Sequence, residues 1–338
     1  MLDEKGFAAF LKKRGLSQVR IDESLAAMRE FEAFLSSGTP RRTLETITAK
    51  EVHAFSRALI GTKRNTREAY FSLIHYGWFS GNHRLTVHAI ELLDGAEVLD
   101  RLYEKVGTAI GEAQRDAVFA ELSPPPLGTP PPERPALTQA FLERLEERVD
   151  RTTWTRLLAD GLRDLSEASY DDAKRLFLES DDLDDYLERK GRAFLAELRE
   201  IQRAGGLYFT QEVTDAVIDF VESNPEIRQG VRHGNVLYET KIPYMTTAYL
   251  EATDVRTKRY AACHCPWVRE SLRTGERSVS PDFCLCSAGF HKKPWEVLFG
   301  VPLTAEVVES ILKGDLQCRF AIHLPPQAQA ARSERMRM

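Results

Sequence analysis

The sequence lacks any hydrophobic run close to the roughly 18 residues that a membrane-spanning helix requires. Its first residues, MLDEK, also lack the charged and apolar regions of a secretory signal peptide. Cysteine is scarce, with five residues in 338, and an odd number does not suit a disulfide framework. We therefore expect a protein of the reducing cytoplasm with no membrane partner.

Sequence signatures of several common enzyme classes are also absent. The chain contains no Walker A loop, no Gly-x-Gly-x-x-Gly after a predicted strand, no His-Glu-x-x-His and no Gly-x-Ser-x-Gly. Nucleotide-dependent chemistry and serine hydrolysis are therefore not predicted. The formal net charge of −5 predicts no general affinity for polyanions, so any nucleic-acid binding would have to be local.

A proline-rich segment, SPPPLGTPPPERP, divides the chain. So many prolines cannot continue a helix and favour a stiff, extended spacer. With 43% hydrophobic residues, the 338 residues suffice to bury two or three cores. We predict an α+β protein in the following order: a helical bundle with a trailing helix at 1–122, the proline-rich linker at 123–135, an α+β cysteine-motif domain at 136–325 that begins with helices, and a disordered tail at 326–338.

Residues 1–90 have the pattern of short amphipathic helices. Ile21, Met28 and Leu35 recur at helical spacing, and Thr48 with Glu51 has the spacing of a capping box. The segments FLKKRGLSQVRIDESLAAMREFEAFL, ITAKEVHAFSRALI and NTREAYFSLIHYGWFSGN resemble the SAM-like core-binding domain of tyrosine recombinases and integrases. In that family the catalytic Arg, His-x-x-Arg and Tyr lie in a second domain, and no such set follows here, so recombinase activity is not expected.

Contact of residues 1–90 with DNA is a separate question, because Lys and Arg outnumber Asp and Glu in this region. Basic residues near the predicted helix starts are placed to meet phosphate groups, namely Arg41, Arg42, Lys63, Arg64 and Arg67. A solvated helical face or a protein-docking bundle is the alternative interpretation. Further along, the acidic run ESDDLDDYLE at 179–188 lacks the glycine and the ligand spacing of an EF-hand, so we interpret it as a solvated face or a helix start.

Four of the five cysteines form two Cys-x-Cys pairs, Cys263 with Cys265 and Cys284 with Cys286. Side chains two residues apart share a face in an extended strand, and Pro266 disfavours a helix before it. Two such strands would bring four sulfur atoms together for zinc or an iron–sulfur cluster. A redox or nucleophilic cysteine and inert packing thiols are the alternatives.

The C-terminal part of the sequence predicts a helix capped by Thr304 and then a final strand. In that strand Cys318, Phe320 and Ile322 alternate with polar residues. We therefore interpret Cys318 first as a buried core thiol, with metal ligation as the alternative. The ending VESILKGDLQCRFAIHLP, with CHCPWVRE and FCLCSAGFHKKPWE, resembles a poorly characterised bacterial cysteine-motif family. That family is related to vinyl-reductase-type small-molecule-binding and aminothiazoline-carboxylate hydrolase-like domains. The resemblance implies an α+β domain that binds a small ligand, in some cases with a metal.

Other side chains near the cysteines are candidates for function. Arg269 and Lys292 can clamp an anion, Tyr244 and Tyr249 can line a pocket, and Glu270 and His291 can transfer protons. His264 would point away from its neighbouring cysteines on a regular strand, which indicates a structural role. Solvated loop charges and half-buried tyrosines are the ordinary alternatives.

Two functions follow from these patterns. The first is a sensor or carrier module whose four cysteines hold zinc, or an iron–sulfur cluster, beside a small-molecule site, coupled to the helical domain that docks on DNA or protein. The alternative is a small-molecule enzyme of hydrolase or reductase type, in which a Cys thiolate or a metal-activated water at the same cluster attacks the substrate. The sequence leaves open whether the protein is an enzyme.

Overall fold

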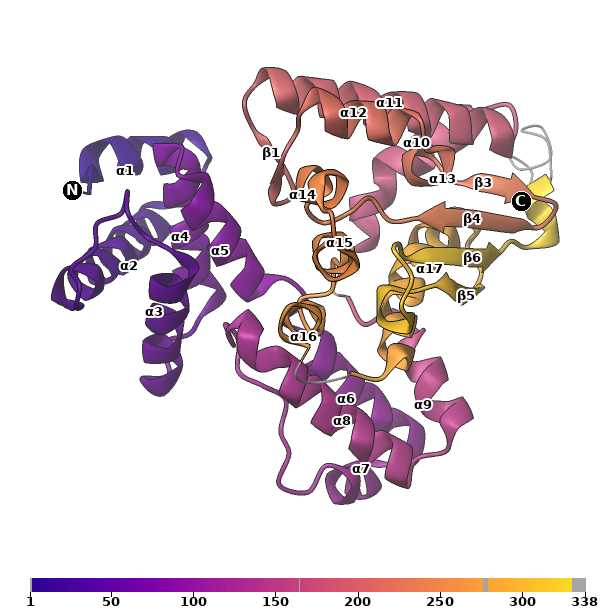
Figure 1. Ribbon diagram of the computed structural model, residues 1–338, viewed down its shortest axis with the longest axis horizontal. Helices are drawn as coiled ribbons and strands as arrows, with labels where there is room; N and C mark the ends of the chain where they lie inside the picture. Colours follow the sequence, from indigo (N-terminus) through magenta and orange to yellow (C-terminus); the bar gives the residue numbers. More distant parts are fainter. Residues whose placement is uncertain (1, 164, 276–278, 330–338) are drawn as a thin grey trace. The chain divides into compact units, whose positions relative to one another are not determined.

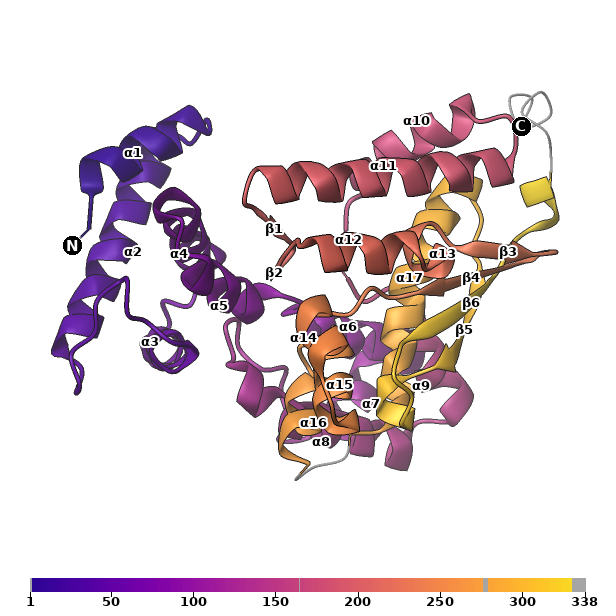
Figure 2. The same ribbon diagram turned by 45° about the horizontal axis from the view of Figure 1, so that its top comes forward.

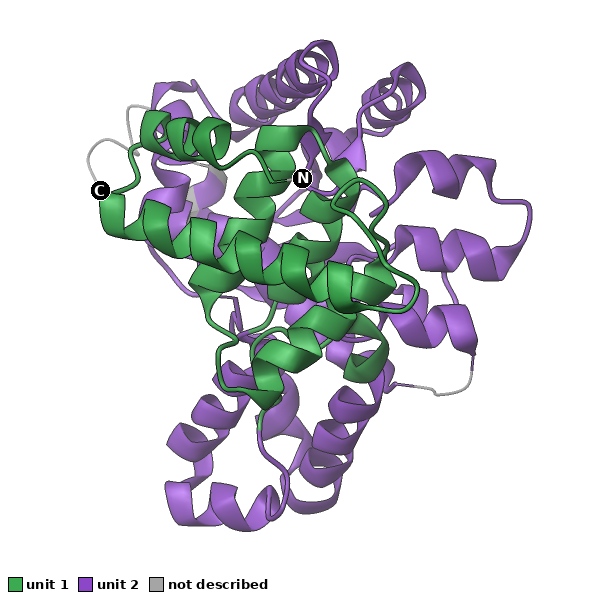
Figure 3. Cartoon of the chain, turned by 90° about the vertical axis from the view of Figure 1, so that its left-hand side faces the viewer, with its two compact units in different colours: residues 1–96, 124–134 green, residues 97–123, 135–338 purple. Residues whose placement is uncertain are grey.

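Figure 1 shows the computed structural model, which describes residues 2–163, 165–275 and 279–329. The described chain is mostly helical, with a small antiparallel sheet near its C-terminal end, in agreement with the α+β class predicted from the sequence. Contacts divide the chain into two compact units (Figure 3). Unit 1 comprises Met1–Ala96 and Pro124–Arg134, and unit 2 comprises Glu97–Ser123 and Pro135–Met338. Each unit is described by itself.

Unit 1 is a helical bundle around one hydrophobic core, which contains Phe7, Met28, Phe55, Tyr70 and Leu85. Its elements are α1 (Glu4–Lys13), α2 (Gln18–Ser37), α3 (Ala49–Gly61), α4 (Arg67–Ser80), α5 (His83–Leu93) and the short 3-10 helix η1 (Pro131–Glu133). The capping box predicted for Thr48 and Glu51 is confirmed at the start of α3.

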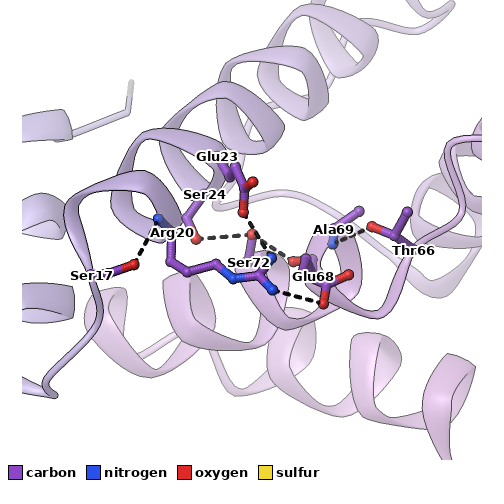
Figure 4. A network of polar contacts seen from close by, with 8 residues as sticks. All are labelled: Ser17, Arg20, Glu23, Ser24, Thr66, Glu68, Ala69 and Ser72. Atoms are coloured by element: carbon purple, nitrogen blue, oxygen red, sulfur yellow. Dashed lines mark hydrogen bonds and ion pairs between the residues drawn. The ribbon is translucent and has the colours of Figure 1, made fainter.

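Polar contacts hold α2 against α4 (Figure 4). Ser72 Oγ donates a hydrogen bond of 3.1 Å to Ser24 Oγ in the buried contact between the two helices. At the surface the guanidinium of Arg20 contacts Glu23 at 2.8 Å and Glu68 at 3.3 Å. These surface charges add little to stability, because exposed ion pairs contribute about 0–1 kcal/mol. The orientation of α4 on α2 therefore comes mainly from the apolar core and the buried hydroxyl pair.

The boundary between the two units differs from the one expected from the sequence. Residues 97–122 were expected to trail the N-terminal bundle, but they belong to unit 2, where Val98, Leu102 and Val106 share a core with Phe141. The segment Pro124–Arg134, expected to be a linker, packs within unit 1. Prolines disfavour a helix without preventing burial, and the buried Arg134 donates hydrogen bonds to the carbonyl oxygens of residues 92, 94 and 129.

Unit 2 contains the described helices that follow residue 97, apart from η1 and the first residue of α8. They are α6 (Val98–Ile110), α7 (Glu112–Val118), α8 (Arg134–Arg148), α9 (Arg151–Leu158), η2 (Glu167–Tyr170), α10 (Asp171–Glu179), α11 (Leu183–Arg203), α12 (Asp215–Glu222), α13 (Pro225–Arg228), α14 (Thr246–Glu251), α15 (Val255–Ala262), α16 (Arg269–Thr274), η3 (Pro281–Cys284), α17 (Leu285–Phe299), η4 (Ile311–Lys313) and η5 (Pro326–Gln329). The acidic run at 179–188 is a helix start, because Asp182 caps α11 by accepting from the Asp185 N–H at 2.8 Å.

The strands of unit 2 are β1 (Leu207–Tyr208), β2 (Gln211–Glu212), β3 (Val231–His233), β4 (Val236–Thr240), β5 (Thr304–Glu309) and β6 (Arg319–His323). β1 and β2 form a short hairpin, and the other strands form an antiparallel sheet in the order β3-β4-β6-β5. Leu237 and Ile322 of this sheet share a core with Tyr186 of α11 and Trp295 of α17. Figures 1 and 2 show α17 running beside the sheet, and it contacts both β5 and β6.

The helix predicted from Thr304 is wrong, because Thr304–Glu309 is strand β5. The apolar spacing of Val307, Val308, Ile311 and Leu312 fits a helix, but the segment pairs with β6 and has a register shift between Val307 and Glu309. Tertiary pairing overrides such a local pattern readily where the residues are β-branched. Of the predicted disordered tail, residues 330–338 lie outside the described residues.

Candidate metal and ligand site

The first cysteine pair lies in a connection between helices. α15 ends at Ala262, and the N–H of its C-cap Cys263 donates to the Arg259 carbonyl. The Cys265 carbonyl accepts from Val268 and Arg269 as α16 begins. The predicted strand is therefore wrong at this position. Pro266 does exclude a helix immediately before it, but the chain turns there without becoming a sheet strand.

The second pair lies at the start of α17. Cys284 is the last residue of η3 and the N-cap of α17, and Cys286 is in the first turn of the helix. Residues two apart on a helix are separated by roughly 200° about its axis. The sequence-based expectation that Cys284 and Cys286 share the face of a strand is therefore wrong.

Tertiary contacts nevertheless bring the cysteine segments together. Ser310 Oγ donates to Cys284 Sγ at 3.0 Å, and Arg259 Nε of α15 donates to the Ile311 carbonyl of η4 at 3.0 Å. The Lys241 N–H donates to the Cys318 carbonyl at 2.9 Å. Cys263, Cys265, Cys286 and Cys318 all belong to, or pack against, one hydrophobic core of unit 2. All five cysteines are free thiols.

Burial controls the acidity of these thiols. It raises the pKa of Cys263, Cys284 and Cys318, and it raises that of Cys286 to about 12. Neighbouring cysteines add to the rise, since Cys265, Cys318 and Cys284 each raise the pKa of Cys263. Cys263, Cys284, Cys286 and Cys318 are therefore protonated thiols at neutral pH. Cys318 packs on the same core as Cys263, Cys265 and Cys286, in keeping with the core role that the sequence analysis gave it ahead of a ligand role.

The thiols do not form a ready-made metal site. Across residues 2–163, 165–275 and 279–329, no group of three or more His, Cys, Asp or Glu side chains could hold a metal ion. The donor type itself suits a soft metal, because cysteines from three chain segments belong to, or pack against, one hydrophobic core. Side-chain rotation would have to complete such a site.

Arg269 and Tyr244 lie together, whereas Glu270 is engaged elsewhere. The guanidinium of Arg269, which is 4% exposed, lies 3.9 Å from the ring centroid of Tyr244. Glu270 accepts hydrogen bonds from Tyr260 at 2.9 Å and from Arg273 at 2.8 Å. Because both of its oxygens are occupied, Glu270 is better placed to hold α16 than to transfer protons.

Lys292 and Tyr249 make other contacts than the pair Arg269 and Tyr244. The buried ammonium of Lys292 donates to Glu296 at 2.7 Å and to the Leu303 carbonyl at 3.0 Å, so it connects α17 with the segment before β5. The ring of Tyr249 lies 4.8 Å from the Lys258 ammonium and packs on the same core as the cysteines. A direct anion contact by Lys292 would require these two hydrogen bonds to break.

His264 has a structural role, although the strand from which that role was predicted is absent at this position. Its Nε2 is 2.6 Å from the Ile242 carbonyl oxygen, and its ring meets Tyr244 edge to face with centroids 5.3 Å apart. Burial lowers its pKa to about 3, with help from the charge of Lys241. The imidazole is therefore neutral, and Nε2–H donates to the carbonyl.

The main residue that the sequence analysis missed is Glu239 on β4. It is 8% exposed and accepts from Lys190 Nζ at 2.9 Å, from His291 Nδ1 at 2.9 Å and from Trp295 Nε1 at 3.3 Å. A signal was present, because strand alternation places Glu239 on the same face as the apolar Leu237. A carboxylate on an inward strand face requires buried partners.

Comparison with family models, with curated proteins and with solved structures found no match for this chain. The resemblances to the SAM-like domain and to the cysteine-motif family therefore stay predictions. In the described residues, no helix is long and apolar enough to cross a membrane.

Proposed function

We propose that unit 2 is a metal-binding module in which cysteine thiolates hold a zinc ion beside a small-molecule site. The proposed ligands are Cys263, Cys265, Cys284 and Cys286. The observation that supports this function is the convergence of free thiols from three distant segments onto one core. In a reducing compartment such a cluster suits a soft metal ion better than a disulfide. An iron–sulfur cluster would use the same donors.

Thiol acidity favours metal binding over a nucleophilic enzyme. A reactive cysteine requires a lowered pKa, because the thiolate is the nucleophile. Burial raises the pKa of Cys263, Cys284, Cys286 and Cys318, which makes them poor nucleophiles at neutral pH. A zinc ion deprotonates a coordinating thiol outright, so the same burial does not prevent metal binding. With these four thiols, the hydrolase or reductase alternative would need a metal-activated water.

The test is metal content in protein purified without oxygen and under reducing conditions. We expect about one zinc per chain, lost when any one of the four proposed ligands is changed to Ser. Thermal stability should fall with the metal, because a site that assembles only in the folded chain contributes its binding energy to folding. A visible absorption spectrum would distinguish an iron–sulfur cluster from zinc.

Cys318→Ala is the matched control, because it removes a thiol of the same cluster that is outside the proposed ligand set. It should keep the metal and cost only a packing term, on the order of 1 kcal/mol. Metal-free wild-type protein would overturn the proposal. Metal loss in Cys318→Ala, with full metal in one of the four Ser variants, would overturn this ligand set.

We further propose that unit 1 is a docking domain with at most weak affinity for DNA. Two of the five basic side chains considered for phosphate contact are paired with carboxylates, since Arg64 contacts Glu30 at 2.7 Å and Arg42 contacts Glu51 at 3.6 Å. Arg41, Lys63 and Arg67 are the exposed cations left for phosphate. Few phosphate contacts give weak, salt-sensitive binding.

This docking role is tested with a labelled DNA duplex and fluorescence anisotropy at low and high salt. We expect binding that disappears as the salt concentration rises, and a further loss when Arg41, Lys63 and Arg67 are changed together to Ala. Absence of binding at low salt would favour a protein partner instead.

A further inference from the structure

One face of α17 forms a polar contact with β4 and the residue that follows it. Ser287, His291 and Trp295 are one helical turn apart, so they share this face. Lys241 Nζ donates to Ser287 Oγ at 3.1 Å, while His291 and Trp295 both contact Glu239. We call the residues Glu239, Lys241, Ser287, His291 and Trp295 the α17–β4 contact.

Glu239 fixes the proton positions on His291. Burial by itself would raise the pKa of Glu239, but the charge of Lys190 and the contacts of His291 outweigh it and lower this pKa to about 2. Glu239 is therefore a carboxylate and can only accept hydrogen bonds. The Nδ1 atom of His291 must carry the proton, so the lone pair of the neutral ring is on Nε2.

The Nε2 atom of His291 is buried and has no hydrogen-bond partner in the described part of the chain. Phe320 covers one side of the ring, with centroids 4.5 Å apart. Burial and the charges of Lys241 and Lys190 lower the pKa of His291, against the opposing effect of Glu239. A buried acceptor of this kind usually has a donor, so the site calls for one from outside the chain.

Lys241 is the second group that lacks a matching partner. Its ammonium donates to Ser287 and lies 5.6 Å from the ring centroid of Phe290, which is 36% exposed. Among the described residues, no carboxylate forms an ion pair with Lys241. A cation that is partly removed from water favours an anion beside it.

We propose that Lys241 and His291 together bind a small 2-hydroxycarboxylic acid, in which the carboxylate contacts Lys241 and the hydroxyl donates to Nε2 of His291. The two groups are close enough for one small ligand, because Lys241 contacts Ser287 one turn before His291, and His291 contacts Glu239 two residues before Lys241. A hydroxyl fits better than an ammonium group, because the positive charge of Lys241 would repel a second cation. Glu239 and Ser287 are positioning residues.

This inference names the ligand class for the small-molecule site of the proposed function and rests on that site being present. Calorimetric titration with lactate and with propionate tests it, because the two acids differ by one hydroxyl. A site built to hydrogen-bond a hydroxyl rejects the analogue that lacks it. We expect lactate to bind the wild-type protein at least about tenfold more tightly than propionate.

The variants separate the two roles. Lys241→Met should lose affinity for both lactate and propionate. His291→Phe should bind the two acids with equal, weak affinity. Lys293→Met, which removes a neighbouring charge on α17 outside the contact, should leave both affinities unchanged. Glu239→Gln should shift the imidazole proton between Nδ1 and Nε2 in nitrogen-15 NMR spectra and reduce the preference for lactate.

Equal affinity of the wild-type protein for lactate and propionate, or no binding of lactate, would overturn the proposal. So would a preference for lactate that survives in His291→Phe. Metal content measured on the same samples distinguishes failure of the ligand proposal from failure of the cysteine metal site. Intact metal without lactate binding rejects only the ligand, whereas absent metal with lactate binding rejects only the cysteine site.

Discussion

Ser56 Oγ donates a hydrogen bond of 2.6 Å to the carbonyl oxygen of Gly128, which is 72 residues further along the chain. Tyr70 Oη lies 2.7 Å from the same hydroxyl. The proline-rich segment is therefore anchored in unit 1 through buried groups. The stiff, extended spacer predicted from the sequence would have no such contacts.

Gly128→Ala should destabilise unit 1 and release the proline-rich segment. The residue has a φ of +84°, and a Cβ atom there would lie 1.8 Å from Tyr70 Oη. Overpacking of this kind costs about 1–3 kcal/mol. Urea unfolding gives the stability, and limited proteolysis reports cleavage within Pro124–Arg134. Gly15→Ala is the matched control, because Gly15 shares the positive φ of +82° but has nothing within 4 Å of a built Cβ. Equal costs in the two variants would contradict the anchoring role.

His53 of α3 should make unit 1 less stable in acid. Burial lowers its pKa from 6.5 to about 4, so the unfolded chain binds more protons between these pH values and stability falls as the pH decreases through this window. The other charged groups around the imidazole are Glu91, His88, Arg57 and Arg134. Its Nε2 has no hydrogen-bond partner in the described residues, so His53→Leu leaves no partner unsatisfied there.

We therefore expect the stability of His53→Leu relative to wild type to be greater at pH 4.5 than at pH 7. Thermal unfolding at a series of pH values measures this difference. A constant difference across the series would show that His53 is equally protonated in the folded and unfolded chains.

Gly289→Ala should disturb α17 and with it the candidate site. A Cβ atom at Gly289 would lie 2.6 Å from the carbonyl oxygen of Ala159, at the end of α9. Because the obstacle is backbone, relief requires α17 to shift, at a cost of about 1–3 kcal/mol. Gly61→Ala is the helical control, since nothing lies within 4 Å there, and it should be neutral or stabilising. Chemical denaturation measures the stability of both variants. An unchanged stability of Gly289→Ala would contradict the close approach of Gly289 to Ala159.

Arg319 and Glu226 should contribute more to stability than a typical surface ion pair. Arg319 donates two hydrogen bonds to the Glu226 carboxylate, each of 2.7 Å, and joins β6 to the segment that contains α13. Both side chains are 25% exposed, against 55% and 36% for Arg64 and Glu30. Arg319→Lys removes the two-point contact and should cost on the order of 1 kcal/mol, whereas Arg64→Lys should cost almost nothing.

The same pair predicts a pH dependence. The hydrogen bond from Arg319 is the largest influence on Glu226, and the pKa of Glu226 is lowered from 4.5. Its stabilising contribution is therefore present above pH 4.5 and is lost as the pH falls through the folded-state pKa. Below that range Arg319→Lys and wild type should converge in stability. A difference that persists in acid would mean that Arg319 acts through packing alone.

The sequence by itself determined the helices of unit 1 and the chemistry available in unit 2. Thr48 and Glu51 cap α3 as their spacing requires, and Asp182 starts α11, because caps depend on contacts within a few residues. The inward position of Glu239 is also readable from strand alternation. The composition of the candidate site, with its crowded cysteines, needs no coordinates.

Tertiary structure decided what local patterns leave ambiguous. Thr304–Glu309 becomes a strand because β6 supplies its hydrogen bonds. Cys284 and Cys286 lie at the start of α17, which packs against β5 and β6. The anchoring of Gly128 by Ser56 and the gathering of Cys318 with the other thiols join residues far apart in the chain. Their contact energies depend on neighbours that the folded core supplies, so no window of the sequence encodes them.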